Sequence, residues 1–175
     1  MKKAIQLICV LLIVATLALP VSAAGFKPSV EQKGAPAPVE KDVAVTALVD
    51  LEKAPAEVKK IVEEARKVIT DAKSLEAAVP TLGDTLKEMK ADVKASDLVV
   101  RDLFYVKLDK DLKDGETKTV TFKAEGIEKS NFLMVMVFVD GQWVILDADK
   151  VEITKSGEVK VTFDVVGPVA FVTKK

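Results

Sequence analysis

The segment that decides the fold is Phe132-Leu-Met-Val-Met-Val-Phe-Val139, eight consecutive apolar residues. In a β-strand, successive side chains point to opposite faces of the sheet, so both faces of this strand are apolar and both must be covered. One face is Leu133, Val135, Val137 and Val139, and the other is Phe132, Met134, Met136 and Phe138. The first suits the interior between two sheets, and the bulkier second face can receive an amphipathic helix. We expect a helix there; the alternative is a central strand with an apolar outer face.

Segments of strand-like composition flank this strand on both sides. Asp140-Gly141 is a strong two-residue hairpin signal and Ser156-Gly157 is a weaker one. Alternation is clearest in Glu158-Val-Lys-Val-Thr-Phe163, where Val159, Val161 and Phe163 are expected to face inward. The predicted strands are 98–108, 117–124, 132–139, 142–147, 150–154, 158–164 and 169–173. Short strands at this spacing, each bounded by turn residues, indicate an antiparallel sandwich.

The region before residue 97 has helical periodicity after one candidate strand, residues 43–49. Pro55 suits the first position of a helix over 55–73, whose apolar stripe runs from Val58 to Ala72. A second helical segment follows in two pieces. Ser74 is the expected cap of the first, Pro80 ends it, and Thr81 with Asp84 resembles a capping box for the second.

The chain begins with the three zones of a secretory signal peptide. Met1-Lys2-Lys3 is basic, residues 4–19 are almost wholly apolar, and Pro20-Val-Ser-Ala-Ala24 supplies small residues for cleavage after Ala23. The alternative is an uncleaved membrane anchor.

Together with the strands and helices above, these zones divide the chain into four parts. We predict a signal peptide over 1–23, an extended arm or linker over 24–42, a strand plus helical segment over 43–96 and a sandwich over 97–175. The prediction places the protein in the secreted or extracellular space, with cell-surface association open.

Composition excludes several classes of chemistry. The chain has no histidine, and its one cysteine, Cys9, lies in the leader. These absences remove imidazole and thiol catalysis and nearly all zinc sites. The 26 basic and 27 acidic residues are interspersed, which argues against nucleic acid as a partner, and no later segment is long and apolar enough for stable membrane insertion. We predict no enzyme, no cofactor and no metal site. A carboxylate-based hydrolase stays as a remote alternative.

Four features are candidates for function, each with a structural alternative. Trp143 and Tyr105 are possible ligand contacts as the only aromatic residues with polar groups, although packing is the more common use of such residues. Asp102 falls on the inward face if 98–108 is one regular strand, and a bulge near Arg101-Asp102 explains it more simply than a site. The loop 109–116 fails the calcium pattern, since Lys113 and Asp114 occupy the fifth and sixth positions. Asp147-Ala-Asp149 is a similar acidic pair near a turn.

The chain resembles a group of uncharacterised secreted or surface bacterial proteins with a signal peptide, a helical segment and a C-terminal Ig-like β-module. The segments that carry the resemblance are Phe26-Lys-Pro-Ser-Val30, Leu98-Val-Val-Arg-Asp-Leu-Phe104, Val137-Phe-Val-Asp-Gly-Gln-Trp143, Gly157-Glu-Val-Lys-Val-Thr-Phe163 and Gly167-Pro-Val-Ala-Phe171. It implies no activity and no functional residues.

The resulting prediction is an α+β fold, with an N-terminal strand and two helices packed against a C-terminal antiparallel Ig-like β-sandwich of about seven strands. The expected function is that of an exported, non-catalytic structural or interaction module with an unknown protein or glycan partner. The alternative is a carbohydrate- or peptide-binding accessory protein. Loops 109–116, 125–131 and 147–149 are expected to face that partner.

Overall fold

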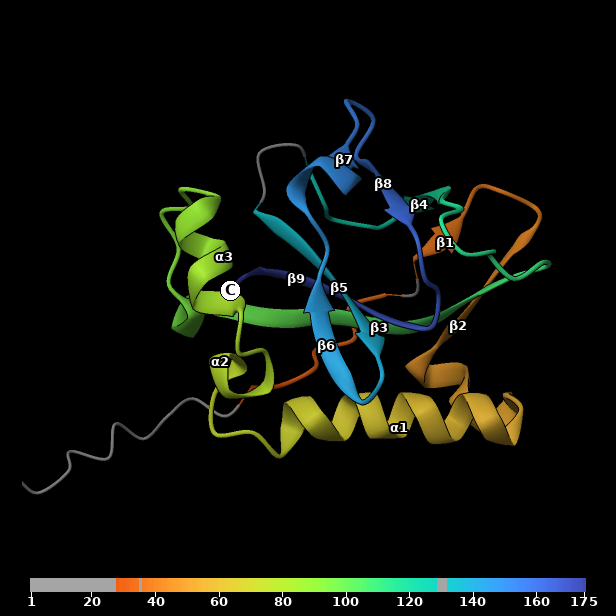
Figure 1. Ribbon diagram of the computed structural model, residues 1–175, viewed down its shortest axis with the longest axis horizontal. Helices are drawn as coiled ribbons and strands as arrows, with labels where there is room; N and C mark the ends of the chain where they lie inside the picture. Colours follow the sequence, from red (N-terminus) through yellow and green to blue (C-terminus); the bar gives the residue numbers. More distant parts are fainter. Residues whose placement is uncertain (1–27, 35, 129–131) are drawn as a thin grey trace, which may run out of the picture.

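The computed structural model describes residues 28–34, 36–128 and 132–175; the predicted signal peptide lies outside these residues. Helices and two antiparallel sheets make up the described chain, which confirms the α+β class (Figure 1). One sheet has five strands in the order β2-β3-β9-β5-β6, and the other has four in the order β1-β4-β8-β7.

The five-stranded sheet is built around two long strands. β3 (Leu98–Leu108) pairs with β9 (Pro168–Lys174) on one side and with β2 (Val43–Ala47) on the other. β9 also pairs with β5 (Leu133–Val139), which forms a hairpin with β6 (Gln142–Ile145). Asp140 and Gly141 both have positive φ at that turn, as a tight two-residue hairpin requires. The predicted strand over 43–49 therefore belongs to this sheet and not to a separate layer.

The four-stranded sheet packs on one face of the larger sheet. It consists of β1 (Ala37–Pro38), β4 (Lys118–Lys123), β8 (Glu158–Phe163) and β7 (Val151–Ile153). Val159, Val161 and Phe163 of β8 are fully buried between the sheets, which confirms the predicted alternation. Four phenylalanines meet in this core with ring centroids 5.0 to 6.2 Å apart, in three edge-to-face pairs and one tilted pair: Phe104, Phe122, Phe163 and Phe171.

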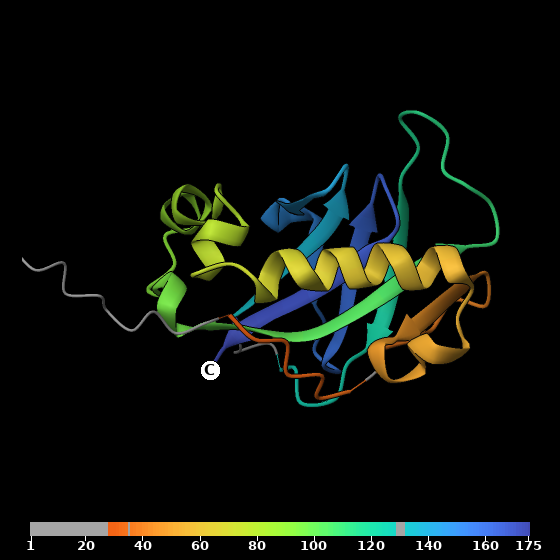
Figure 2. The ribbon, with the colours of Figure 1, turned by 90° about the horizontal axis from the view of Figure 1, so that it is seen from below.

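The helices cover the opposite face of the five-stranded sheet. Figure 2 shows α1 (Ala56–Thr70) lying across the strands, with α2 (Leu75–Ala78) and α3 (Leu82–Glu88) beyond its end. Val62, Ala65 and Ile69 of α1 form one apolar cluster with Met134, Met136 and Phe138 of β5. Leu133, Val135 and Val137 face the other sheet. The prediction of a helix on the Met/Phe face of this strand is confirmed.

The two expected helix caps have different outcomes. The Ser74 hydroxyl accepts a hydrogen bond from the Ala77 N–H at 3.1 Å, as predicted for the start of α2. The predicted Thr81–Asp84 capping box is wrong, because Thr81 has helical φ and ψ and its side chain makes no capping bond. Asp84 instead pairs with Lys87 on the exposed face of α3 at 2.9 Å. No helix in the described ranges is long and apolar enough to cross a membrane.

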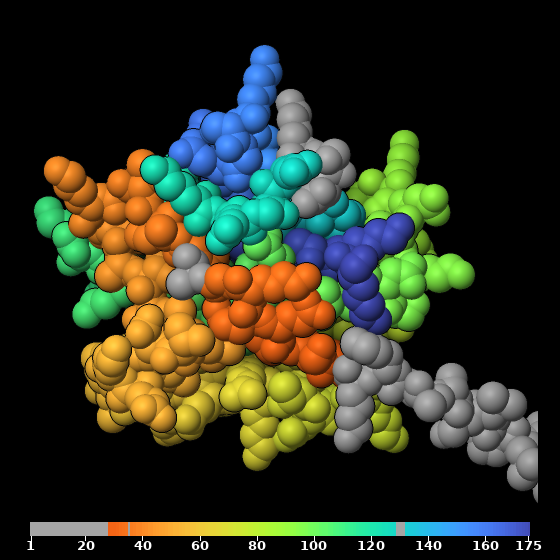
Figure 3. Space-filling view, turned by 180° about the vertical axis from the view of Figure 1, so that it is seen from behind, coloured from red at the N-terminus to blue at the C-terminus, as the bar shows by residue number. Residues whose placement is uncertain are grey.

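Short 3₁₀ turns connect the helices and strands. They are Leu48–Lys53 before α1, Ala95–Asp97 before β3 and Ala148–Lys150 before β7. The predicted arm, residues 24–42, is extended where it is described, but it is packed and not free. Residues 28–34 lie along the first half of β3, with Val30 bridging Val100 in parallel, and β1 then joins the edge of the smaller sheet. Figure 3 shows this arm, in orange-red, against the body of the protein.

Candidate functional site

A β-bulge in β3 places two charged residues inside the protein. The β3–β9 register shifts between Val100 and Asp102, which leaves Arg101 without a partner on β9. Before the bulge, Val100 faces the helices; after it, Phe104 faces the inter-sheet core, although the two residues are an even number apart. The bulge predicted near Arg101-Asp102 is therefore confirmed. The bulge reverses the face of the sheet on which the following side chains lie, so the two halves of β3 alternate in opposite phase between the two cores.

Asp102 is buried and satisfied by the arm. Its side chain is 1% exposed; its Oδ1 accepts a hydrogen bond from the Gly34 N–H at 3.0 Å, and its Oδ2 lies 3.4 Å from Arg101 Nε. Burial raises the pKa of the Asp102 carboxyl above its ordinary value, while the Gly34 N–H and the Arg101 charge act in the opposite direction. This carboxylate is therefore a structural partner of the arm and of Arg101.

Arg101 is buried as deeply, with a side chain 7% exposed. Its Nη2 donates a hydrogen bond to the Glu125 carbonyl oxygen, and its Nε faces Asp102. Its Nη1 is also buried but has no hydrogen-bond partner within the described chain. A buried donor without an acceptor costs free energy, more so when it carries charge. The Arg101 guanidinium is therefore held in place at Nε and Nη2, while Nη1 lacks an acceptor among the described residues.

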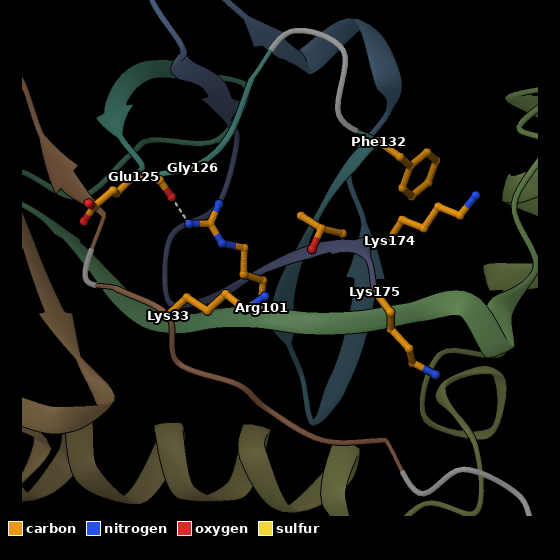
Figure 4. Close-up of a pocket in the computed structure, with 8 residues that line it drawn as sticks. Lys33, Arg101, Glu125, Gly126, Phe132, Lys174 and Lys175 are labelled. Atoms are coloured by element: carbon orange, nitrogen blue, oxygen red, sulfur yellow. Dashed lines mark hydrogen bonds between the residues drawn. The ribbon is translucent and has the colours of Figure 1, made fainter.

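A cleft of about 540 Å³ opens beside this guanidinium. Its lining comes from five separate segments: Lys33 of the arm, Arg101 of β3, Glu125 and Gly126 after β4, Phe132 before β5, and Thr173, Lys174 and Lys175 at the end of β9. Figure 4 shows Arg101 and Lys33 on one side of the cleft, with Phe132 and Lys174 opposite them. The Glu125 carboxylate points away from Arg101, and its carbonyl points toward it. Four of the lining side chains are basic and one is acidic. Two of the four have acidic partners next to the cleft, Glu31 at 3.1 Å from Lys33 and Asp102 at 3.4 Å from Arg101. The excess of basic groups in the lining suits the cleft to an anion.

The predicted ligand contacts lie elsewhere. Trp143 is 3% exposed; its ring packs on Phe138, and its Nε1 donates a hydrogen bond to the Ala65 carbonyl of α1 at 2.9 Å. Tyr105 is half-buried and packs against the same helix-side cluster. Neither residue lines the cleft, so the structure does not bring them together with Arg101. A ligand could reach the Trp143 ring only by displacing α1.

The acidic loops hold no assembled metal site in the part of the chain that the structure describes. In these ranges, no group of three or more Asp or Glu side chains is close enough to hold a metal ion. The loop 109–116 forms a separate surface hollow with Asp42 and Lys118, which are joined by an ion pair of 2.7 Å.

Sequence reasoning identified the position of the bulge but not the cleft. From the sequence, an inward-facing Asp102 and a bulge near Arg101-Asp102 were alternatives, and the structure has both. The other lining residues are far apart in the sequence. The pairing of β3 with the arm and with β9 brings Lys33 and residues 173–175 to Arg101, and the pairing of β9 with β5 brings Phe132 to the same place. Of the loops expected to face a partner, only 125–131 contributes to the cleft, through Glu125 and Gly126.

Comparisons of the chain with models of protein families, with curated proteins and with solved structures gave no match.

Proposed function

We propose that this protein is an exported, non-catalytic interaction module that binds an acidic partner in the cleft at Arg101. One observation supports this most strongly: the Arg101 side chain is 7% exposed and lies beside a cleft lined with lysines, and its buried Nη1 has no hydrogen-bond partner among the described residues. An anionic group in that cleft could accept a hydrogen bond from the Arg101 guanidinium and so gain affinity. Protein and glycan partners both carry such groups.

The Ig-like part of the proposal is supported by the order of the strands. β1-β4-β8-β7 has the neighbours of strands A-B-E-D in an Ig domain, and β9-β5-β6 has those of F-C-C′. The place of the last Ig strand, G, is taken by β3, which precedes β4 to β9 in the chain, and β2 pairs with its outer side. We therefore propose an Ig-like sandwich in which the strand at the G position is supplied from the N-terminal side.

The non-catalytic part rests on the types of residue in the cleft. Its lining offers cations, one threonine and a phenylalanine, while the buried carboxylate of Asp102 is held by Gly34 and Arg101. A general acid–base pair needs two groups that can exchange protons with a substrate. Only the Glu125 carboxylate comes from the lining residues, and it points away from Arg101. Binding is the chemistry that this arrangement supports.

A binding screen tests the proposal. The chain from residue 24 on, labelled with ¹⁵N, is titrated with polyglutamate, polygalacturonate, a glycerol-phosphate polymer and neutral dextran. Acidic polymers are expected to shift the backbone amide signals of Lys33, Gly126 and Thr173, and dextran is not. The double variant Lys33→Ser/Lys174→Ser should weaken binding, whereas Lys110→Ser/Lys113→Ser, which removes the same charge from loop 109–116, should not.

Two results would overturn the proposal. One is that no acidic polymer shifts the cleft amides. The other is reproducible turnover of a glycosidase, peptidase or esterase substrate that disappears when a single Asp or Glu is replaced.

A further inference from the structure

Within the proposed function, on which this step rests, we infer that the group bound at Arg101 is a carboxylate carried on a sugar ring, as in a uronic acid. The inference concerns which acidic partner the cleft takes. It follows from the geometry of the guanidinium, the charge behind it, the aromatic wall opposite it and the pairing of the strands that border it.

The guanidinium is oriented for a planar anion. Asp102 at Nε and the Glu125 carbonyl at Nη2 hold the plane of the group, so its remaining N–H groups have fixed directions. A fixed guanidinium fork matches the two coplanar oxygens of a carboxylate in a two-point contact. Lys33, on the same side of the cleft, adds a second cation; its ammonium pairs with the exposed carboxylate of Glu31 at 3.1 Å, and its flexible side chain can also turn toward a ligand.

The charge behind the guanidinium favours a single negative charge over a double one. Arg101 already faces the Asp102 carboxyl, which lies 3.4 Å from its Nε and is 1% exposed. A phosphate monoester would place up to two further negative charges near this buried carboxyl, and a carboxylate only one. Like charges repel most strongly where water is excluded, so the carboxylate is the better fit.

A sugar ring fits the remainder of the cleft better than a peptide does. The half-buried ring of Phe132 forms part of the wall opposite Arg101, and an aromatic face can pack on the apolar face of a sugar. Extended peptides are generally held by main-chain pairing with an open strand edge. Of the described strands at the cleft, β9 lies between β3 and β5, and the arm lies along the first half of β3, so neither strand offers such an edge there.

The experiment compares ligands that differ in one feature. Trigalacturonate is titrated by calorimetry, next to its methyl ester, which keeps the rings and removes the charge. Triglutamate, a sulfated trisaccharide and glycerol phosphate are the other arms. We expect trigalacturonate to bind at least about tenfold more tightly than its methyl ester, which is the scale of one charge-assisted contact.

Variants locate the site. Arg101→Lys keeps the charge and loses the planar fork, so binding should weaken about tenfold or more. Because Arg101 is buried and this variant can unfold, Phe132→Ala and Lys33→Ser are measured as well, and each should weaken binding several-fold. Lys113→Ser is the control and should leave binding unchanged.

Each further outcome has a defined meaning. The uronate assignment would be overturned if trigalacturonate and its methyl ester bound equally. It would also be overturned if triglutamate, the sulfated sugar or glycerol phosphate bound more tightly than trigalacturonate. Either result would leave the acidic-partner proposal standing. Binding by none of the charged ligands, in this set or among the longer polymers, would overturn both.

Discussion

Asp102 shows what one buried carboxyl does to the pH dependence of stability. Its pKa is raised by burial, so between the unfolded value of about 4 and its higher folded value the folded protein binds more protons than the unfolded chain. The contribution of Asp102 to stability therefore rises as pH falls through that range. Glu40, Asp42 and Asp164 have lowered pKa values and act in the opposite direction, since their contribution is lost on acidification.

A single substitution isolates the Asp102 contribution. Asn at position 102 keeps an oxygen that can accept from the Gly34 N–H but does not titrate. The free energy of unfolding of the wild type, minus that of Asp102→Asn, should be larger at pH 4.5 than at pH 7. Urea unfolding of both proteins at both pH values measures this difference. A difference that shrinks on acidification would show that the Arg101 charge outweighs burial at this carboxyl.

Phe163 tests the core between the two sheets. Its side chain is fully buried, and its ring lies edge-on to Phe122 with centroids 6.2 Å apart. Phe163→Ala should lower the free energy of unfolding by about 3–5 kcal/mol, because the truncation removes buried area and leaves a cavity. Chemical denaturation gives the value. A loss below about 1 kcal/mol would mean that the ring is not packed as described.

At the scale of elements, α1 is a helix that depends on docking. A helix of 15 residues is marginal in water, so its order must come mainly from its buried stripe. Within that stripe, Val62 is fully buried and its neighbour Ile61 is 36% exposed. Sequence periodicity put both residues on the apolar face, and the structure places Ile61 at its margin.

These neighbours form a matched pair of variants. Val62→Asp should destabilise the protein by about 3 kcal/mol or more, because the charge has no partner in the helix-side cluster. Ile61→Asp should cost less than about 1 kcal/mol, since that side chain can reach water. Thermal unfolding followed by circular dichroism compares them. If Val62→Asp does not fold, Val62→Ala provides a graded loss at the same site. Equal effects of the two Asp variants would contradict the described face of α1.

The elements that could be predicted are those specified by local signals. Strand β3 was predicted with its observed ends, because residues 98–108 are uniformly strand-like up to the polar loop that follows. The two faces of β5 were predicted from side-chain size. Two contacts could not be predicted, because they join residues that are far apart in sequence. One is the hydrogen bond from Arg101 to the Glu125 carbonyl, and the other is the position of Lys33 at the cleft. The two-residue strand β1 inside the predicted linker was missed because it is too short for any periodicity.

At the scale of the whole molecule, the prediction of export concerns the start of the protein. We predict that the protein found outside the cell begins at Ala24 or within two residues of it, because Val21-Ser-Ala23 offers small residues at the positions that signal peptidase reads. Mass spectrometry of the protein from culture medium and cell envelope checks this. Recovery of a membrane-bound species that retains Met1 would contradict the prediction.

The two cores of the molecule share a single sheet. The five-stranded sheet contacts the helices on one face and the smaller sheet on the other, so its inner strands β3, β9 and β5 carry no solvated face over most of their length. A loss of packing on one face is therefore transmitted to the other through the same backbone. The cleft at Arg101 lies where this sheet, the arm and the loop after β4 meet, so its geometry depends on the docking of all three.

The position of β9 also has a consequence for the timing of folding during synthesis. β9 is made after every other strand, yet it lies between β3 and β5, where it pairs Leu98 with Lys174 and Val135 with Phe171. Until β9 has been synthesised, β3 and β5 lack the strand that lies between them, and each core lacks the two β9 side chains that belong to it. Pairings between such distant segments form late. We therefore expect the five-stranded sheet to be completed only after β9 is available, and for the export that we propose, an incomplete sheet is the form in which a chain can still be threaded through a translocation channel.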